Sequence, residues 1–165
     1  MSEKKDAIAT RPGSGMVLRT VEDHKKFAMA AFYSGFLSGG EGDKQVAVAK
    51  AMMQIQYGAE VDIGPMSAIQ GIAIIQGKPS MAAALMASLV KGSGKYRFKV
   101  LKHDDKVCSL EFYERFDQRW EIAGTSTFTI KDAADAELTT GKNKHSWKKY
   151  PRNMLFARAM SNGAR

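Results

Sequence analysis

The hydrophobic pattern of this chain changes its period part-way along, and that change constrains the fold more than any other feature. Before Lys95 apolar side chains recur at helical spacing, about 3.6 residues, whereas from Lys95 they alternate with polar ones. Alternation predicts strands with one apolar and one polar face. Three such runs, the first two joined by a tight turn at 103–106, predict an antiparallel meander. The residues expected on its apolar face are Tyr96, Phe98, Val100, Cys108, Leu110, Phe112, Trp120, Ile122, Phe128 and Ile130.

Two amphipathic helices are predicted near the start of the chain. Thr20 suits an N-cap, and acidic residues follow it in the first turn, where the helix dipole favours negative charge. This helix is expected to run to about Ser38. Asp43 suits the cap of a second helix over Lys44–Tyr57, and Gly58 is expected to end it.

Shorter elements are predicted between these helices and the meander. Pro65 is expected to open a helical turn, and the run IAII at 72–75 is expected to form a brief buried strand. Pro79 is expected to begin a further helix, which Gly92 ends. That helix is apolar nearly all round, which predicts a position inside the core.

The residues after the meander predict two helices separated by a basic loop. A short helix is expected at 131–137, the loop at 139–146, and a last helix from Pro151. The whole order favours an α+β fold in which a three-stranded meander packs on helices. We expect one domain over 20–165, preceded by a mobile arm at 1–19 that shows no apolar period.

Composition excludes several classes of protein. A single cysteine and three histidines are too few for a disulfide scaffold or a structural zinc site. No stretch approaches 18 consecutive apolar residues, so we expect no membrane partner. The first residues lack the apolar core of a secretory signal, which favours a cytoplasmic location.

No motif of the sequence predicts catalysis. The dipeptide Gly94-Lys95 fails the phosphate-loop pattern, because Leu89 stands where the first glycine is needed and Tyr96 where a hydroxyl residue is needed. The carboxylates are interpreted as solvated partners of strand lysines, and Cys108 as a small buried hydrophobe. We therefore expect no enzyme, no cofactor, no catalytic residue and no metal.

Positive charge is concentrated in the second half of the chain. Residues 1–90 carry 9 basic and 8 acidic side chains, whereas residues 91–165 carry 16 basic and 9 acidic ones. From Leu138 to Arg165, which we call the acid-free segment, there are seven basic residues and no acidic one. Such a bias points to a polyanionic partner, although a basic surface that only keeps the protein soluble explains the charge equally well.

Within the acid-free segment, cations are interleaved with two aromatic rings, Trp147 and Tyr150. Single-stranded nucleic acid requires both, because cations neutralise phosphates and flat rings stack on unpaired bases. The alternative is that Trp147 and Tyr150 anchor the segment to the core. Arg97 and Lys99, on the polar face of the first strand, are candidates to extend the same surface. The candidate cations of the segment are Lys142, Lys144, Lys148, Lys149, Arg152 and Arg158.

Two stretches resemble the RecT family of phage single-strand annealing proteins. The first is Ile74–Ser80 with the apolar residues after it, the second is Trp147–Ala159, and the similarity runs from about Met52 to Arg165. The resemblance implies a β-β-β-α core, assembly into rings or helical filaments, and ATP-independent annealing of single-stranded DNA in phage recombination and repair. The DNA contacts that it implies are Lys148, Lys149, Tyr150, Arg152 and Arg158, together with Trp147 and Lys78.

The resemblance also implies partners. They are single-stranded DNA, the annealed duplex intermediate, further copies of the chain, a partner exonuclease and a host single-strand binding protein, in the cytoplasm of a bacterial host. Three alternatives stay open. The chain could coat single strands without annealing them, could bind RNA, or could be a nuclease.

Overall fold

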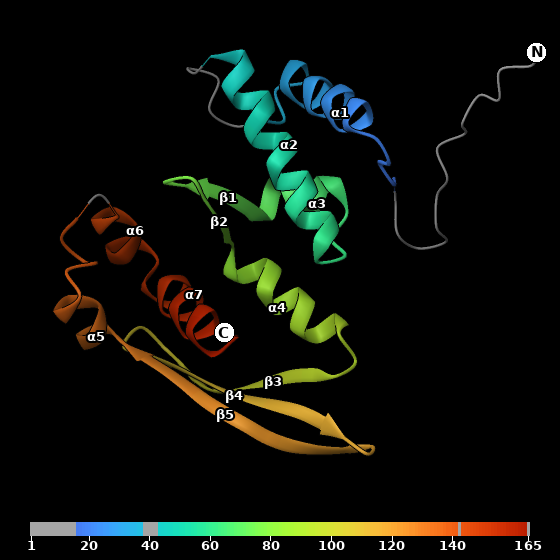
Figure 1. Ribbon diagram of the computed structural model, residues 1–165. Helices are drawn as coiled ribbons and strands as arrows, with labels where there is room; N and C mark the ends of the chain where they lie inside the picture. Colours follow the sequence, from blue (N-terminus) through green and yellow to red (C-terminus); the bar gives the residue numbers. More distant parts are fainter. Residues whose placement is uncertain (1–15, 38–42, 142, 165) are drawn as a thin grey trace, which may run out of the picture. The chain divides into compact units, whose positions relative to one another are not determined.

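The computed structural model describes residues 16–37, 43–141 and 143–164 of the chain. The chain divides into two compact units, Met1–Met81 (unit 1) and Ala82–Arg165 (unit 2), and the boundary falls inside the single domain expected from the sequence. Both units combine helices with antiparallel strands, which confirms the α+β class (Figure 1). Of the N-terminal arm expected at 1–19, the structure describes residues 16–19, which form no helix or strand. The rest of the arm lies outside the described residues.

Unit 1 contains three helices and a two-stranded sheet among its described residues. Its core consists of small and branched side chains from the first two helices, Ala28, Val48, Ala51 and Ile55. Because the alanines let the helices approach closely, larger side chains such as Phe27 and Phe32 pack around this centre and are only half-buried. The elements are α1 (Val21–Tyr33), α2 (Lys44–Glu60), α3 (Pro65–Gly71), β1 (Ile72–Ile75) and β2 (Lys78–Met81).

Both predicted N-caps of unit 1 are present. The Thr20 hydroxyl accepts a hydrogen bond from the backbone of Asp23, whose carboxylate accepts one from the backbone of Thr20 in return. The Asp43 carboxylate accepts from the backbone N–H of Gln45. The second helix continues two residues past Gly58, where that glycine was expected to end it.

The strand β2 was missed, and the expectation of a helix from Pro79 is wrong. A two-residue turn at Gln76 and Gly77, both with positive φ, folds the chain back on β1. Pro79 then lies opposite Ile74 in a two-stranded sheet, where an edge position tolerates its missing N–H. The apolar helix begins only at Ala83.

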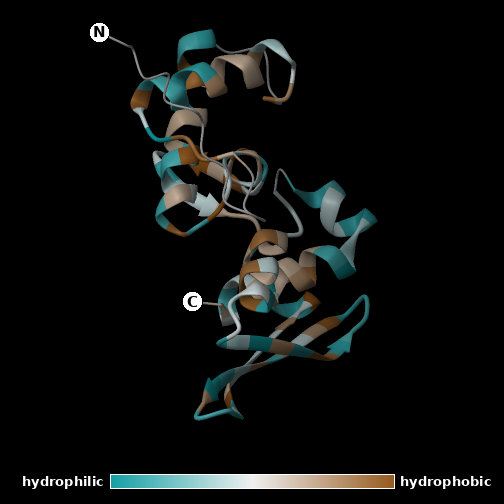
Figure 2. Cartoon of the chain, turned by 90° about the vertical axis from the view of Figure 1, so that its right-hand side faces the viewer, coloured by the Kyte–Doolittle hydropathy of each residue, from teal (hydrophilic) through white to brown (hydrophobic). Residues whose placement is uncertain are grey.

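Unit 2 contains the predicted meander. Three antiparallel strands lie in the order β3 (Tyr96–His103), β4 (Val107–Phe116) and β5 (Arg119–Thr129), and their alternating hydropathy is visible along the ribbons (Figure 2). Asp117 and Gln118, both with positive φ, form the turn between β4 and β5. The helices of the unit are α4 (Ala83–Gly92), α5 (Ile130–Asp135), α6 (Lys144–Lys149) and α7 (Pro151–Gly163). The first turn of α6 replaces part of the loop expected at 139–146.

The core of unit 2 lies between α7 and the inner face of the sheet. Cys108, Leu110 and Phe112 alternate along β4, are buried, and pack in one cluster with Leu155 and Met160 of α7. In Figure 1, α4 and α7 lie on this side of the sheet, and no described helix of the unit lies on the other. We call the two sides the inner and the outer face.

A β-bulge overturns two face assignments made from the sequence. The register of β4 with β5 shifts between Phe112 and Tyr113, so that Ile122 lies opposite Tyr113 whereas Gly124 lies opposite Phe112. Ala123 is the extra residue of the bulge. Directly opposed residues share a face, so Ile122 and Trp120 lie on the outer face, whereas Phe128 lies on the inner face as expected.

The position expected for the apolar helix is only partly correct. None of the ten residues of α4, all of which the structure describes, is buried. Ala83, Met86 and Ala87 are half-buried against the core of unit 2, and Leu85, Leu89 and Val90 are also only half-buried. In the described part of the chain, no helix has both the length and the apolar character that crossing a bilayer requires.

Replacing Gly58 by alanine is expected to destabilise unit 1. A Cβ at this position would lie 2.5 Å from the Cβ of Ala68, which is shorter than van der Waals contact. The methyl group of Ala68 has no rotamer that would move it aside. We expect the free energy of unfolding to fall by about 1–3 kcal/mol, measured by chemical denaturation. Gly92→Ala is the matched control, because a Cβ there meets nothing within 4 Å. Its free energy of unfolding should equal or slightly exceed that of the parent. Equal stability of both variants would contradict this packing.

The capping box of α5 predicts a pH-dependent loss of stability. The Asp132 carboxylate accepts hydrogen bonds from the side chain and backbone of Thr129, which lowers the pKa of Asp132. A lowered folded-state pKa stabilises the protein above the ordinary aspartate pKa, about 3.9, and the contribution is lost as the pH falls through the folded value. At neutral pH we expect Asp132→Asn to unfold at a lower denaturant concentration than the parent protein. Near pH 2 both proteins should unfold at the same concentration. A difference in stability between the two proteins that persists near pH 2 would contradict the role assigned to Asp132.

Candidate nucleic-acid interface

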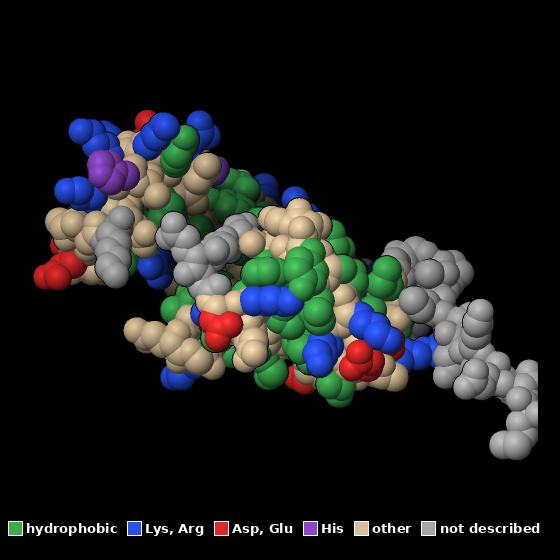
Figure 3. Space-filling view, turned by 90° about the horizontal axis from the view of Figure 1, so that it is seen from above, with side chains coloured by type: hydrophobic (Ala, Val, Ile, Leu, Met, Phe, Trp, Pro, Cys, Tyr) green, Lys and Arg blue, Asp and Glu red, His purple; other side chains and the backbone are tan. Residues whose placement is uncertain are grey.

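The helix α6 carries the densest group of exposed cations in the acid-free segment. Trp147 is buried in the core and anchors the helix, so that Lys144, Lys148 and Lys149 remain exposed around it. Tyr150 follows directly, is 51% exposed, and lies under the Lys149 ammonium, 5.3 Å from the ring centre. We call Lys144, Lys148, Lys149 and Tyr150 the α6 surface. Figure 3 shows basic side chains and a histidine gathered at this end of unit 2.

The cations of the α6 surface have no carboxylate partner among the described residues. The ion pairs among the described residues join Lys95 to Glu114, Lys102 to Asp104 and Lys131 to Asp135. None of these pairs lies in the acid-free segment. An unpaired cluster of ammonium groups repels itself and lowers the free energy of any anion that binds between them. The α6 surface is therefore suited to successive phosphates.

Trp147 belongs to the core and not to the interface. Its side chain is 3% exposed, and its ring packs against Phe128 with 6.5 Å between the ring centres. A base needs one free face of a ring to stack on, and this ring offers none. The sequence left both roles open, and burial decides between them.

Arg152 ties α7 to the sheet. One of its terminal nitrogens donates to the carbonyl of His103 at 3.1 Å, and the His103 imidazole Nε2 lies 2.9 Å from the Arg152 carbonyl. This reciprocal pair fixes the start of α7 at the end of β3. Although Lys148 and Arg152 are four residues apart, they do not share one helix face, because the helix breaks at Tyr150 between α6 and α7.

Arg158, Arg97 and Lys99 lie outside the α6 surface. Arg158 is exposed on α7, six residues after Arg152 and hence about 240° around the helix from it. Arg97 and Lys99 are exposed on the outer face of the sheet, opposite Tyr113 and Glu111 respectively, and so on the side away from α7. Lys78 lies on β2 of unit 1, and Lys142 is outside the described residues.

Two aromatic residues on the outer face were not among the candidates. The Arg97 guanidinium lies 4.3 Å from the ring centre of Trp120 and 5.0 Å from that of Tyr113. The Tyr113 hydroxyl donates to the Glu111 carboxylate, which raises the pKa of Tyr113. The alternation along β4 predicts that Tyr113 lies on the face away from the core. It could not predict the same for Trp120, because the bulge places Trp120 on the other face from the one its spacing indicates.

Two carboxylates and the single thiol of unit 2 have structural roles. Hydrogen bonds from Lys95 and Tyr96 lower the pKa of Glu114, and the turn amides of Lys106 and Val107 lower that of Asp104. Burial raises the pKa of the Cys108 thiol. Among the residues that the structure describes, no group of three His, Cys, Asp or Glu side chains could hold a metal ion.

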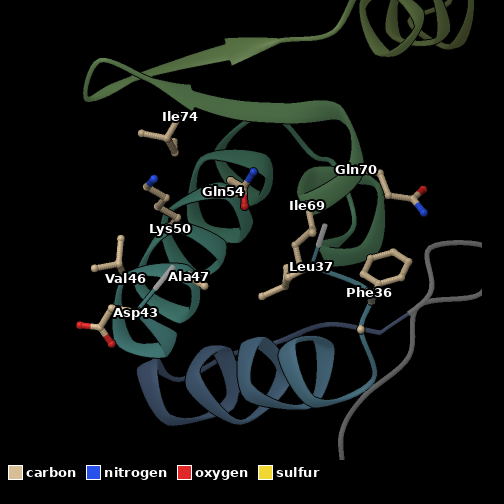
Figure 4. Close-up of a pocket in the computed structure, with 11 residues that line it drawn as sticks. Phe36, Leu37, Asp43, Val46, Ala47, Lys50, Gln54, Ile69, Gln70 and Ile74 are labelled. Atoms are coloured by element: carbon tan, nitrogen blue, oxygen red, sulfur yellow. The ribbon is translucent and has the colours of Figure 1, made fainter. Parts of the chain in front are cut away.

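Unit 1 contains a hollow of about 610 Å³ bordered by α2, α3 and β1 (Figure 4). Its lining mixes apolar side chains such as Ile69 with the polar groups Asp43, Lys50 and Gln54. The Gln54 amide donates to the Ile72 carbonyl and so ties α2 to β1. We assign the hollow no part in the interface, because one lysine among its lining residues is too little charge for a polyanion.

Comparison of the chain with family models, with curated proteins and with solved structures finds no significant match. The assignment of the candidate interface therefore rests on the geometry and charge of this chain alone.

Trp147→Ala is expected to destabilise unit 2 strongly. Removing a buried tryptophan leaves a cavity, and the free energy of unfolding should fall by about 3–5 kcal/mol in chemical denaturation. Tyr150→Ala is the matched control, because half of this neighbouring ring is exposed and its loss should change stability little. If Trp147→Ala is as stable as Tyr150→Ala, the core position assigned to Trp147 is wrong.

Proposed function

We propose that this chain is an ATP-independent single-strand DNA annealing protein, which binds unpaired DNA and pairs complementary strands. The observation that carries the proposal is the α6 surface: three exposed lysines and a half-exposed tyrosine in a segment without acidic residues. The resemblance of Ile74–Ser80 and Trp147–Ala159 to the RecT family supports annealing as the activity.

Lysine ammonium groups suit binding that ignores sequence. Each is a point charge on a flexible stem, so Lys144, Lys148 and Lys149 can follow phosphates whose spacing varies along an unpaired strand. Each phosphate that a lysine neutralises releases condensed counterions, which makes the affinity fall steeply with salt. Tyr150 adds a ring on which any base can stack.

Annealing of this kind involves no covalent step. Two strands resist pairing because their phosphates repel and because each strand folds on itself. A row of protein copies that neutralises one strand and leaves its bases accessible removes both obstacles, and base pairing then supplies the free energy. We propose that the chain acts as a homo-oligomer, because three lysines per copy bind weakly and repetition along one strand multiplies their effect.

Lys148→Ala with Lys149→Ala is expected to weaken binding of a fluorescent oligothymidylate and to flatten its salt dependence. Each lost phosphate contact should lower the slope of log affinity against log salt by about 0.7 for a single strand, or about 1.4 for the pair. Fluorescence anisotropy at several salt concentrations measures both quantities.

Lys25→Ala with Lys26→Ala, on the exposed side of α1, is the charge-matched control and should change the slope little. An equal loss of slope in both double variants would show that net charge, and not the α6 surface, drives binding. An RNA competitor of the same sequence tests the choice of nucleic acid. Displacement by RNA more readily than by DNA would contradict the proposal.

A further inference from the structure

The outer face of the meander in unit 2 carries a group of cations and rings that the α6 surface does not use. It consists of Arg97 and Lys99 on β3, Tyr113 and Arg115 on β4, and Trp120 and Ile122 on β5, which we call the outer sheet face. The helix α6 lies on the inner side, since Trp147 packs against Phe128 there. The two surfaces are therefore on opposite sides of one sheet.

The register of the strands brings the rings of this face together. Arg97 lies opposite Tyr113, Tyr113 opposite Ile122, and Arg115 opposite Trp120. The Arg97 guanidinium lies over both rings, 4.3 Å from the centre of Trp120 and 5.0 Å from that of Tyr113. Aromatic rings and guanidinium planes are the two kinds of side chain on which unpaired bases stack.

The charge of the outer sheet face favours a polyanion. Arg97, Lys99 and Arg115 are exposed and form no ion pair with any described residue. The carboxylate on this face, Glu111, lies opposite Lys99 and accepts a hydrogen bond from the Tyr113 hydroxyl. Three cations against one engaged carboxylate leave an excess of positive charge beside the rings.

The β-bulge is what creates this arrangement. Without the extra residue Ala123, strict alternation would place Trp120 and Ile122 on the same face as Phe128, in the core. With it, Ile122 is 64% exposed and Trp120 lies at the surface against Arg97. An exposed Ile122 and a half-buried Trp120 beside cations suit a ligand with both flat apolar rings and negative charge.

We propose that the outer sheet face is a second contact surface for unpaired DNA, on which bases stack against the cluster of Arg97, Tyr113 and Trp120 while Lys99 and Arg115 contact phosphates. This inference rests on the proposed function and assigns base stacking to residues outside the α6 surface. Stacking is indifferent to base identity, so the site suits a protein that must accept any sequence.

Tryptophan fluorescence reports on this site directly. The chain has two tryptophans, and Trp147 is buried, so quenching by an added oligonucleotide reports on Trp120. We expect oligothymidylate to quench the emission, and a chain of abasic phosphates of equal length to quench it far less. Equal quenching by the abasic chain, or by an acidic polypeptide, would overturn base stacking at this face.

Substitution provides the second measurement. Trp120→Leu is expected to weaken oligothymidylate binding by roughly 5- to 100-fold in anisotropy, whereas Trp120→Phe, which keeps a ring, should retain most of the affinity. Tyr33→Leu, which removes an exposed ring from α1, is the matched control and should bind as the parent does. Equal affinity of Trp120→Leu and Trp120→Phe would contradict the site. If Trp120→Leu does not fold, quenching in the parent protein decides.

The two proposals fail in different ways. If oligothymidylate binds in anisotropy without quenching Trp120, the outer sheet face is not a contact surface and the α6 surface alone carries binding. If oligothymidylate does not bind at all, the proposed function fails and this inference fails with it.

Discussion

The packing of α7 against the inner face of the meander determines the rest of unit 2. Leu155 and Met160 fill the space over Leu110 and Phe112, and Gly163 lets the last turn of the helix approach the Phe112 ring. This contact decides which face of the sheet is core. It thereby leaves the opposite face to solvent and, through Trp147, holds the lysines of α6 outside the core. Both candidate surfaces follow from one apolar interface.

Local patterns predicted the elements that local physics determines. The alternation of Cys108, Leu110 and Phe112 identified a half-buried strand, and the cap of α1 at Thr20 was predicted from residues within one turn. The errors arise where distant pairing decides. The strand containing Pro79 exists only because it pairs with β1, and the bulge at Ala123 is set by the partner strand β4. No period within either segment encodes those partners.

The candidate site was predictable to the same extent. Charge counts identified the exposed lysines of α6, because ammonium groups stay in water wherever the backbone runs. They could not distinguish a stacking ring from a core anchor, and burial shows that Trp147 is the anchor whereas Tyr150 is exposed. Nor could they show that Arg152 bonds to a carbonyl 49 residues away in sequence. Such roles depend on tertiary contacts.

The central claim is that this chain pairs complementary single strands without an energy source. Its most direct test mixes two complementary oligonucleotides, one with a fluorophore and one with a quencher, with no nucleotide present. The account predicts that the protein brings the labels together several times faster than they pair alone, and that Lys148→Ala with Lys149→Ala removes most of the acceleration. Strands that are bound by the protein yet pair no faster than in buffer would contradict it and indicate a protein that only coats them.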